Sequence, residues 1–119
     1  MNNADLGTFG EQLACDFIRK KKYQIIDRNY RFKKNEIDIV AKKDNKLIII
    51  EVKTRQTSEI GEPWQAVSKQ KQKQVIKVAN HYVQNNNIEL ETRFDIISII
   101  HNSFITELIH IEEAFYPRW

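Results

Sequence analysis

The sequence has few of the residues that define specialised small folds. Among 119 residues there are one cysteine, two prolines and three glycines, and 41% of the residues are hydrophobic. Cys15 therefore has no partner for an intrachain disulfide, and the three histidines show no spacing with it that suits zinc. The composition instead favours one soluble globular domain over residues 1–119.

Long hydrophobic runs are also absent. The longest unbroken aliphatic run is Leu47 to Ile50, and residues 1–9 lack a basic stretch that leads into an apolar one. The sequence thus predicts neither a membrane span nor a signal peptide. Together with the single cysteine, this favours a cytoplasmic location.

Positive charge is concentrated in the first three quarters of the chain. The net charge is only +3, but residues 1–88 hold 17 Lys and Arg against 10 Asp and Glu, whereas residues 89–119 hold two against six. Such an imbalance makes a polyanion partner plausible, although charge runs are more often solvated helix and loop surfaces. The basic residues form two concentrations, one over Arg19–Lys34 and one over Lys69–Lys77.

Hydrophobic periodicity predicts two helices and five strands. Helical spacing of apolar residues marks a first helix over Leu6–Ile18, ending near Lys22, and a second over about Ala66–Val83. Segments rich in β-formers predict strands at 23–32, 36–41, 46–53, 93–100 and 105–111. The order α-β-β-β-α-β-β indicates an α/β fold, a mixed sheet of about five strands flanked by helices.

Two of these strands form a predicted hairpin that carries acidic residues. If Asp44 and Asn45 make a two-residue turn, Asp38 lies opposite Glu51 and Glu36 lies opposite Lys53. All four side chains then share one face of the sheet. Two opposed carboxylates repel one another, and Mg²⁺ or Mn²⁺ between them would remove the repulsion.

Lys53 follows Glu51 by two residues and so points to the same face. A bound metal that generates a nucleophile and a cation that offsets developing negative charge are the main needs of phosphodiester hydrolysis. The alternative is a plain cross-strand ion pair of Glu36 with Lys53 beside a solvated acidic face. The apolar neighbours on this face favour the metal, because buried unpaired carboxylates are costly.

Glu11 lies at the flank of the first helix, where it could lean over the sheet. An equally good alternative is a capping box over Thr8–Glu11, in which the glutamate only bonds back to the start of the helix.

Short motifs recur in a fixed order that resembles a known family. They are Asn-x-x-Asp-Leu-Gly-x-x-Gly-Glu11, Asn29-Tyr30-Arg31, Glu36-Ile-Asp38-Ile-Val-Ala, Ile50-Glu51-Val-Lys53-Thr-Arg55, Ala66-Val67 with Lys71, and Arg93-Phe94-Asp95. On these residues the chain resembles the YraN-like family of small bacterial proteins expected to be endonucleases. Asn35 stands where relatives commonly have glycine, and asparagine also tolerates positive φ.

The resemblance implies a restriction endonuclease-like fold and a nuclease site. That superfamily carries an Asp and a Glu-x-Lys motif on a β-hairpin, and the chain is similar to archaeal Holliday junction resolvases. It implies that Glu11 is the helix carboxylate, that Asp38 and Glu51 are metal ligands together with the main-chain carbonyl of Val52, and that Lys53 is the catalytic lysine. The catalytic residues expected are thus Glu11, Asp38, Glu51 and Lys53.

We therefore expect a Mg²⁺- or Mn²⁺-dependent endonuclease that hydrolyses DNA, with structured or branched DNA as a candidate substrate. Backbone contacts are expected from Arg31, Arg55, Lys69 and Lys71. The alternative is a nucleic-acid-binding module that keeps the nuclease fold but does not cut. A homodimer is a further hypothesis, for which Trp64, Phe115, Tyr116 and Trp119 are candidate interface residues.

Overall fold

The predicted order of elements is confirmed. The computed structural model describes residues 1–57 and 61–117, with one short 3₁₀ helix, η1, added to the expected elements. The elements are α1 (Asn3–Lys20), β1 (Gln24–Phe32), β2 (Asn35–Lys43), β3 (Lys46–Arg55), η1 (Pro63–Gln65), α2 (Lys69–Asn85), β4 (Glu91–His101) and β5 (Thr106–Phe115).

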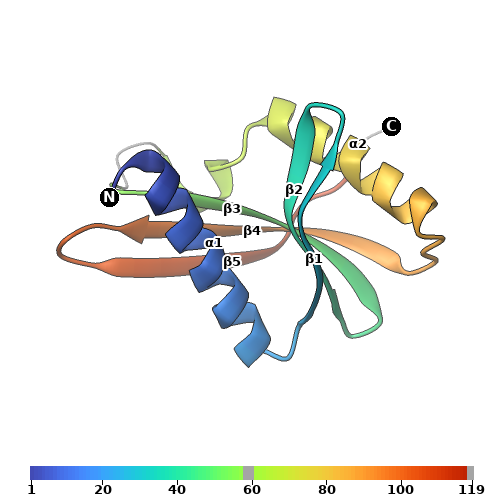
Figure 1. Cartoon of the computed structure of the whole chain (residues 1–119), viewed down its shortest axis with the longest axis horizontal. Helices are drawn as coiled ribbons and strands as arrows, with labels where there is room; N and C mark the ends of the chain where they lie inside the picture. The colour runs from blue at the N-terminus through green and yellow to red at the C-terminus, as the bar shows by residue number, and fades with distance from the viewer. Residues whose placement is uncertain (58–60, 118–119) are drawn as a thin grey trace.

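The five strands form one mixed sheet in the order β1-β2-β3-β4-β5 (Figure 1). Strands β3 and β4 pair in parallel, as the intervening helix α2 requires, and the other neighbours are antiparallel. This is the α/β architecture, consistent with a restriction endonuclease-like fold, that the sequence predicted.

The helices cover opposite faces of the sheet because the central strands are apolar on both sides. In β3, Ile48 and Ile50 pack in the core under α1, whereas Leu47 and Ile49 pack in the core under α2. All four are fully buried. No helix in the described ranges is both long and apolar enough to cross a membrane.

The ends of both helices are set by side-chain caps. The Asn2 side chain caps α1 by accepting a hydrogen bond from the main-chain N–H of Asp5 (2.8 Å), and Thr8 lies inside the helix. The capping-box alternative for Glu11 is therefore wrong. Ser68 caps α2 by accepting from the N–H of Lys71 (3.1 Å), so this helix begins three residues later than predicted.

The predicted hairpin turn and register are confirmed. Asp44 and Asn45 both have positive φ, at 51° and 63°, as a two-residue turn of type I′ requires. The pairs run from Lys43–Lys46 to Ile39–Ile50. In the preceding turn, Lys33 takes the positive φ of 57°, and Asn35 is the first residue of β2.

The aromatic residues proposed for an interface differ in exposure. Phe115 is only 6% exposed and packs in the core on the α2 side, so its proposed interface role is wrong. Trp64 and Tyr116 are exposed, and Trp119 lies outside the described residues.

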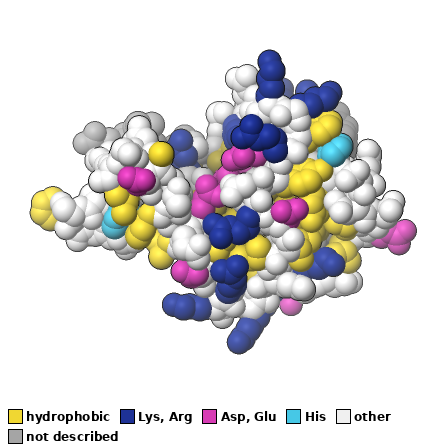
Figure 2. All heavy atoms as spheres, in the orientation of Figure 1, with side chains coloured by type: hydrophobic (Ala, Val, Ile, Leu, Met, Phe, Trp, Pro, Cys, Tyr) yellow, Lys and Arg dark blue, Asp and Glu magenta, His cyan; other side chains and the backbone are white. Residues whose placement is uncertain are grey.

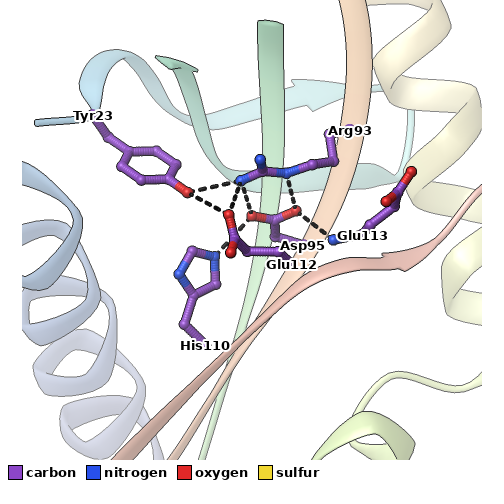
Figure 3. Close-up of polar contacts among 6 residues, drawn as sticks. All are labelled: Tyr23, Arg93, Asp95, His110, Glu112 and Glu113. Atoms are coloured by element: carbon purple, nitrogen blue, oxygen red, sulfur yellow. Dashed lines mark hydrogen bonds and ion pairs between the residues drawn. The ribbon is translucent and has the colours of Figure 1, made fainter. Parts of the chain in front are cut away.

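A buried polar network joins the start of β4 to β5 and to the segment before β1 (Figure 3). Asp95 is fully buried and accepts hydrogen bonds from Arg93, from His110 Nε2 (2.8 Å) and from the main-chain N–H of Glu113 (3.0 Å). Arg93 also donates to the Tyr23 hydroxyl (2.7 Å). Burial by itself would raise the pKa of Asp95, but these hydrogen bonds and the Arg93 charge outweigh it and lower that pKa.

We predict that Asp95→Asn lowers the free energy of unfolding by about 3–5 kcal/mol at pH 7, because it leaves Arg93 without its buried counter-charge. Since the carboxylate has a lowered pKa, its contribution is present above about pH 4 and is lost as the pH falls through the folded-state pKa. Urea unfolding from pH 7 to pH 3 measures this. A pH-independent difference, or one no larger than that of the exposed control Glu89→Gln, would contradict it.

Candidate metal and nuclease site

The candidate site begins where the β2–β3 pairing ends. The last paired residues are Ile39 and Ile50, and beyond them Asp38 replaces a ladder bond with its own side chain. The main-chain N–H of Val52 donates to Asp38 Oδ2 at 2.8 Å, and the N–H of Asp38 lies 3.4 Å from Glu51 Oε1. The two carboxylates are therefore held together, as the predicted register required.

Strand β2 does not keep simple alternation through Asp38. Ile37 and Val40 pack on the α2 side of the sheet, whereas Ile39 and Ala41 pack on the α1 side. The break coincides with Asn29 of β1, which has a positive φ of 53° between the pairs Arg28–Ile39 and Tyr30–Ile37. Local irregularities of this kind re-aim side chains, and here Asp38 is the residue at the break.

The predicted pairing of Glu36 with Lys53 does not form. Glu36 instead lies across β1 from Arg31, with 3.4 Å between Arg31 Nη2 and Glu36 Oε2. Lys53 is exposed, and no acidic side chain of the described residues lies within ion-pair distance of its ammonium group. The plain ion-pair alternative is therefore wrong.

Glu51 is a buried acid and Asp38 a half-buried one, and both have raised pKa values. Glu51 is only 4% exposed. Burial, followed by the charge of Asp38, raises the pKa of Glu51 to about 9. Burial also raises the pKa of Asp38, although the hydrogen bonds from Val52 and Glu51 and the nearby Lys71 oppose this. Two such acids ionise together only when a cation compensates them.

Glu11 of α1 belongs to the same electrostatic group. Burial, followed by the charges of Asp38 and Glu36, raises the pKa of Glu11 to about 7. Its Oε1 atom is buried and has no hydrogen-bond partner. Because the cap role is excluded, this unpartnered oxygen has no structural function within the described residues.

Close helix–strand packing places Glu11 over the sheet. The neighbouring Gly10 is buried against β3, and a Cβ atom there would collide with the side chain of Thr54. A residue without a side chain is thus required where α1 crosses the end of β3. The motif Gly10-Glu11 combines this close approach with the carboxylate.

A cleft of about 550 Å³ lies between the start of α1 and the end of β3. Its walls include Glu11, Val52, Lys53 and Arg55, so four of the predicted site residues share one cavity. Asp38 and Glu51 are not among the wall residues, but the charge of Asp38 acts on Glu11.

The predicted basic residues divide into two groups. Lys71 lies close enough to the acids for its charge to lower the pKa values of Asp38 and Glu51. Arg31 and Lys69 are exposed, at the end of β1 and the start of α2. Figure 2 shows acidic side chains between the N-terminal half of α1 and β2, with Lys and Arg side chains beside them.

Sequence reasoning missed Arg28 as a neighbour of the site. Its charge lowers the pKa of Glu11, and its Nη1 atom lies 3.3 Å from Oε1 of Gln12 on α1. Arg28 appeared in the sequence only as part of a basic run. Its role depends on how β1 packs against α1, and this packing cannot be predicted from a local sequence pattern.

The donor set fits a hard divalent cation. No group of three His, Cys, Asp or Glu side chains in the described ranges is arranged as a complete ligand set. Mg²⁺, however, takes one or two carboxylates and completes its shell with water and phosphate. Asp38 and Glu51 supply such a pair, and the unpartnered Oε1 of Glu11 is a further oxygen beside it.

The fold and these residues define an α/β protein with Asp and Glu-x-Lys on the central hairpin, which is consistent with a restriction endonuclease-like fold. Residues 10–99 match the model of the uncharacterised protein family UPF0102, and the chain belongs to this family, which is the YraN-like family.

Several UPF0102 proteins are similar over nearly their whole length. That of Christiangramia forsetii is 46% identical over 112 residues, and that of Flavobacterium psychrophilum is 45% identical over 112, each comparison covering 94% of both chains. That of Clostridioides difficile is 41% identical over 118 residues, which is 97% of this chain and 100% of the relative. These names state no activity, so the argument for function rests on the site.

We predict that Glu51→Gln stabilises the metal-free protein at pH 8 by on the order of 2 kcal/mol. A raised carboxyl pKa means that the folded state binds the extra proton, so stability falls as the pH rises from about 4.5 to about 9. The glutamine removes this loss. Thermal unfolding in EDTA measures it, with the exposed Glu89→Gln as control.

Addition of Mg²⁺ or Mn²⁺ should reverse the order of stability, so that the native protein becomes more stable than Glu51→Gln. The metal should raise the melting temperature of the native protein and of Glu89→Gln but leave Glu51→Gln unchanged, because ligands that bind only the folded state stabilise it. A destabilised Glu51→Gln in EDTA would contradict the electrostatic account.

Proposed function

We propose that this protein is a Mg²⁺- or Mn²⁺-dependent endonuclease that hydrolyses phosphodiester bonds in DNA. The observation that carries the proposal is the group of three carboxyls, Glu11, Asp38 and Glu51, whose pKa values are all raised, chiefly by burial, with the charge of Asp38 raising those of Glu11 and Glu51 further. A divalent cation relieves that repulsion, and it would supply positive charge beside a substrate phosphate.

The other requirements of the reaction are metal binding, charge compensation and DNA binding, and each is assigned to particular residues. Asp38 and Glu51, with the main-chain carbonyl of Val52, are the proposed metal ligands, and Glu11 is a direct or water-mediated one. Lys53, exposed in the cleft, is the proposed catalytic lysine, which offsets negative charge on the phosphate in the transition state. Arg55 and Lys71 are proposed to hold the DNA backbone next to the site, and Arg31 and Lys69 to extend that contact.

A second candidate is a nucleic-acid-binding module that keeps the fold but does not cut. It is favoured by the lack of a complete three-residue ligand group in the described part of the chain. The basic side chains serve both candidates equally, so only the effect of changing the acids distinguishes them. A cytoplasmic location, which rests on the single buried Cys15, and a homodimer stay predictions.

We predict that Asp38→Asn and Lys53→Ala each reduce metal-dependent cleavage by at least 100-fold while changing DNA affinity less than threefold. Each removes a group that acts at the reacting phosphate and leaves the proposed backbone contacts of Arg31, Arg55, Lys69 and Lys71 in place. The measurement is cleavage of labelled duplex, single strand, flap and four-way junction with Mg²⁺, Mn²⁺ or EDTA.

Lys42→Ala is the matched control for Lys53→Ala, because Lys42 is an exposed lysine of the same hairpin near its turn. It should cut like the native protein. Cleavage that persists in both site variants marks a contaminating nuclease, and salt-sensitive binding with no cleavage by the native protein would establish the non-cleaving module instead.

We predict that Lys69→Ala and Lys71→Ala each lower the slope of log affinity against log salt concentration by about 0.9, the effect of one lost contact to duplex phosphate. The affinity loss should be similar for unrelated sequences, because phosphate contacts carry little sequence information. Fluorescence anisotropy between 50 and 300 mM salt measures this. An unchanged slope in both variants would place the DNA on another surface.

A further inference from the structure

The tip of the β4–β5 hairpin carries an exposed phenylalanine. Phe104 is 90% exposed, more than any other large hydrophobic side chain in the described residues. Its neighbours Ile105 and Ile109 are also exposed, at 44% and 45%. Single exposed apolar residues are common on protein surfaces, so exposure alone means little. This turn is different because hydrogen bonds hold it in one conformation and join it to the cleft.

Hydrogen bonds fix the turn that presents Phe104. The Asn102 side-chain oxygen accepts from the main-chain N–H groups of Phe104 (2.8 Å) and Ile105 (3.1 Å). The Asn102 N–H donates to the carbonyl of Ile105 (3.0 Å), and His101 Nδ1 lies 2.6 Å from the hydroxyl of Thr106. The ring therefore extends from an ordered turn, which reduces the entropy lost on binding.

The same turn is tied to the walls of the cleft. The Asn102 amide donates to the carbonyl of Gln56 (2.8 Å), and Gln56 lines the cleft together with Glu11 and Lys53. The His101 ring stacks on Phe9 of α1, with centroids 4.2 Å apart. Contacts with α1 and with the end of β3 thus fix the position of the Phe104 turn relative to the candidate site.

The sheet register sets the separation between them. Glu51 lies beside Ile96 of β4, and Phe104 follows Ile96 by eight residues. At about 3.3 Å per strand residue the separation is roughly 25 Å. This is an upper limit because β4 ends at His101, and at the spacing of about 3.4 Å between stacked duplex nucleotides it corresponds to at most about seven nucleotides. Figure 1 shows the hairpin extending past the start of α1 at one end of the molecule.

We propose that Phe104 stacks on an unpaired base of the nucleic acid, within about seven nucleotides of the phosphate held at the candidate site. This rests on the proposed function. Exposed aromatic rings bind bases by stacking, whereas a continuous duplex hides its base faces. Phe104 would thereby direct the protein to the boundary between duplex and single strand. The apolar tip, only three side chains, is too small for a stable interface with a second copy.

The tip residues 101–107 contain no Lys or Arg. The effect of Phe104 on DNA affinity can therefore be measured separately from that of the phosphate contacts. We expect Phe104→Ala to weaken binding to a duplex with a single-stranded arm by about tenfold. Binding to blunt duplex should change less than twofold, and the salt slope should stay the same. Phe104→Trp should keep the preference. Tyr116→Ala, at an exposed aromatic residue past the end of β5, is the matched control.

Anisotropy in EDTA measures binding without cleavage, so it tests this contact even if no cleavage is found. 2-Aminopurine placed at successive arm positions should change its fluorescence at the position where the base reaches the ring of Phe104. This change should occur with the native protein and not with Phe104→Ala. Equal affinities of native protein and Phe104→Ala for the armed duplex would overturn the inference and leave the proposed function standing. No binding to either DNA would overturn both. Conversion of a dimer to a monomer by Phe104→Ala, seen by light scattering, would assign the ring to a second copy instead.

Discussion

The repulsion among three carboxyls is the constraint around which this structure is organised. Glu51 is buried and Asp38 half-buried where β2 and β3 separate, and the charge of Asp38 acts both on Glu51 and on Glu11 from α1. Such an arrangement reduces the stability of the folded state at neutral pH. Proteins keep it where a cation or a reaction uses it, which is why the acids, and not the basic surface, carry the functional argument.

The rest of the fold holds these acids in place. Two apolar cores, one on each side of the sheet, fix the hairpin, and Gly10 allows α1 to lie close to Thr54. On the neighbouring strand β4, Asp95 pairs with Ile50, and its network joins β4, β5 and Tyr23, with its charge compensated by Arg93. Within the described residues, Asp95 is thus a buried acid with satisfied hydrogen bonds, whereas no described cation fully compensates the group of Glu11, Asp38 and Glu51.

Local patterns were enough to predict the elements and the hairpin register. Asp44-Asn45 required positive φ and so fixed the turn, and period-2 spacing then placed Asp38 with Glu51. The break of alternation at Asp38 was not predicted, because it depends on the strained Asn29 of the neighbouring strand. The role of Glu11 could not be decided either, since a cap and a site carboxylate look alike until the helix start at Asn2 is known. Arg28 and the Asp95 network depend on tertiary contacts that sequence spacing does not encode.

The most direct test of a divalent-cation site is paramagnetic broadening by Mn²⁺ in an amide NMR spectrum of the whole chain. We predict that the amide signals of Asp38 and Val52 broaden first, at Mn²⁺ concentrations well below those that affect Asn45 in the turn at the far end of the hairpin, and that Glu51→Gln removes this effect. Broadening that begins at exposed acids such as Glu89 and Glu112, or that is the same in Glu51→Gln, would contradict it.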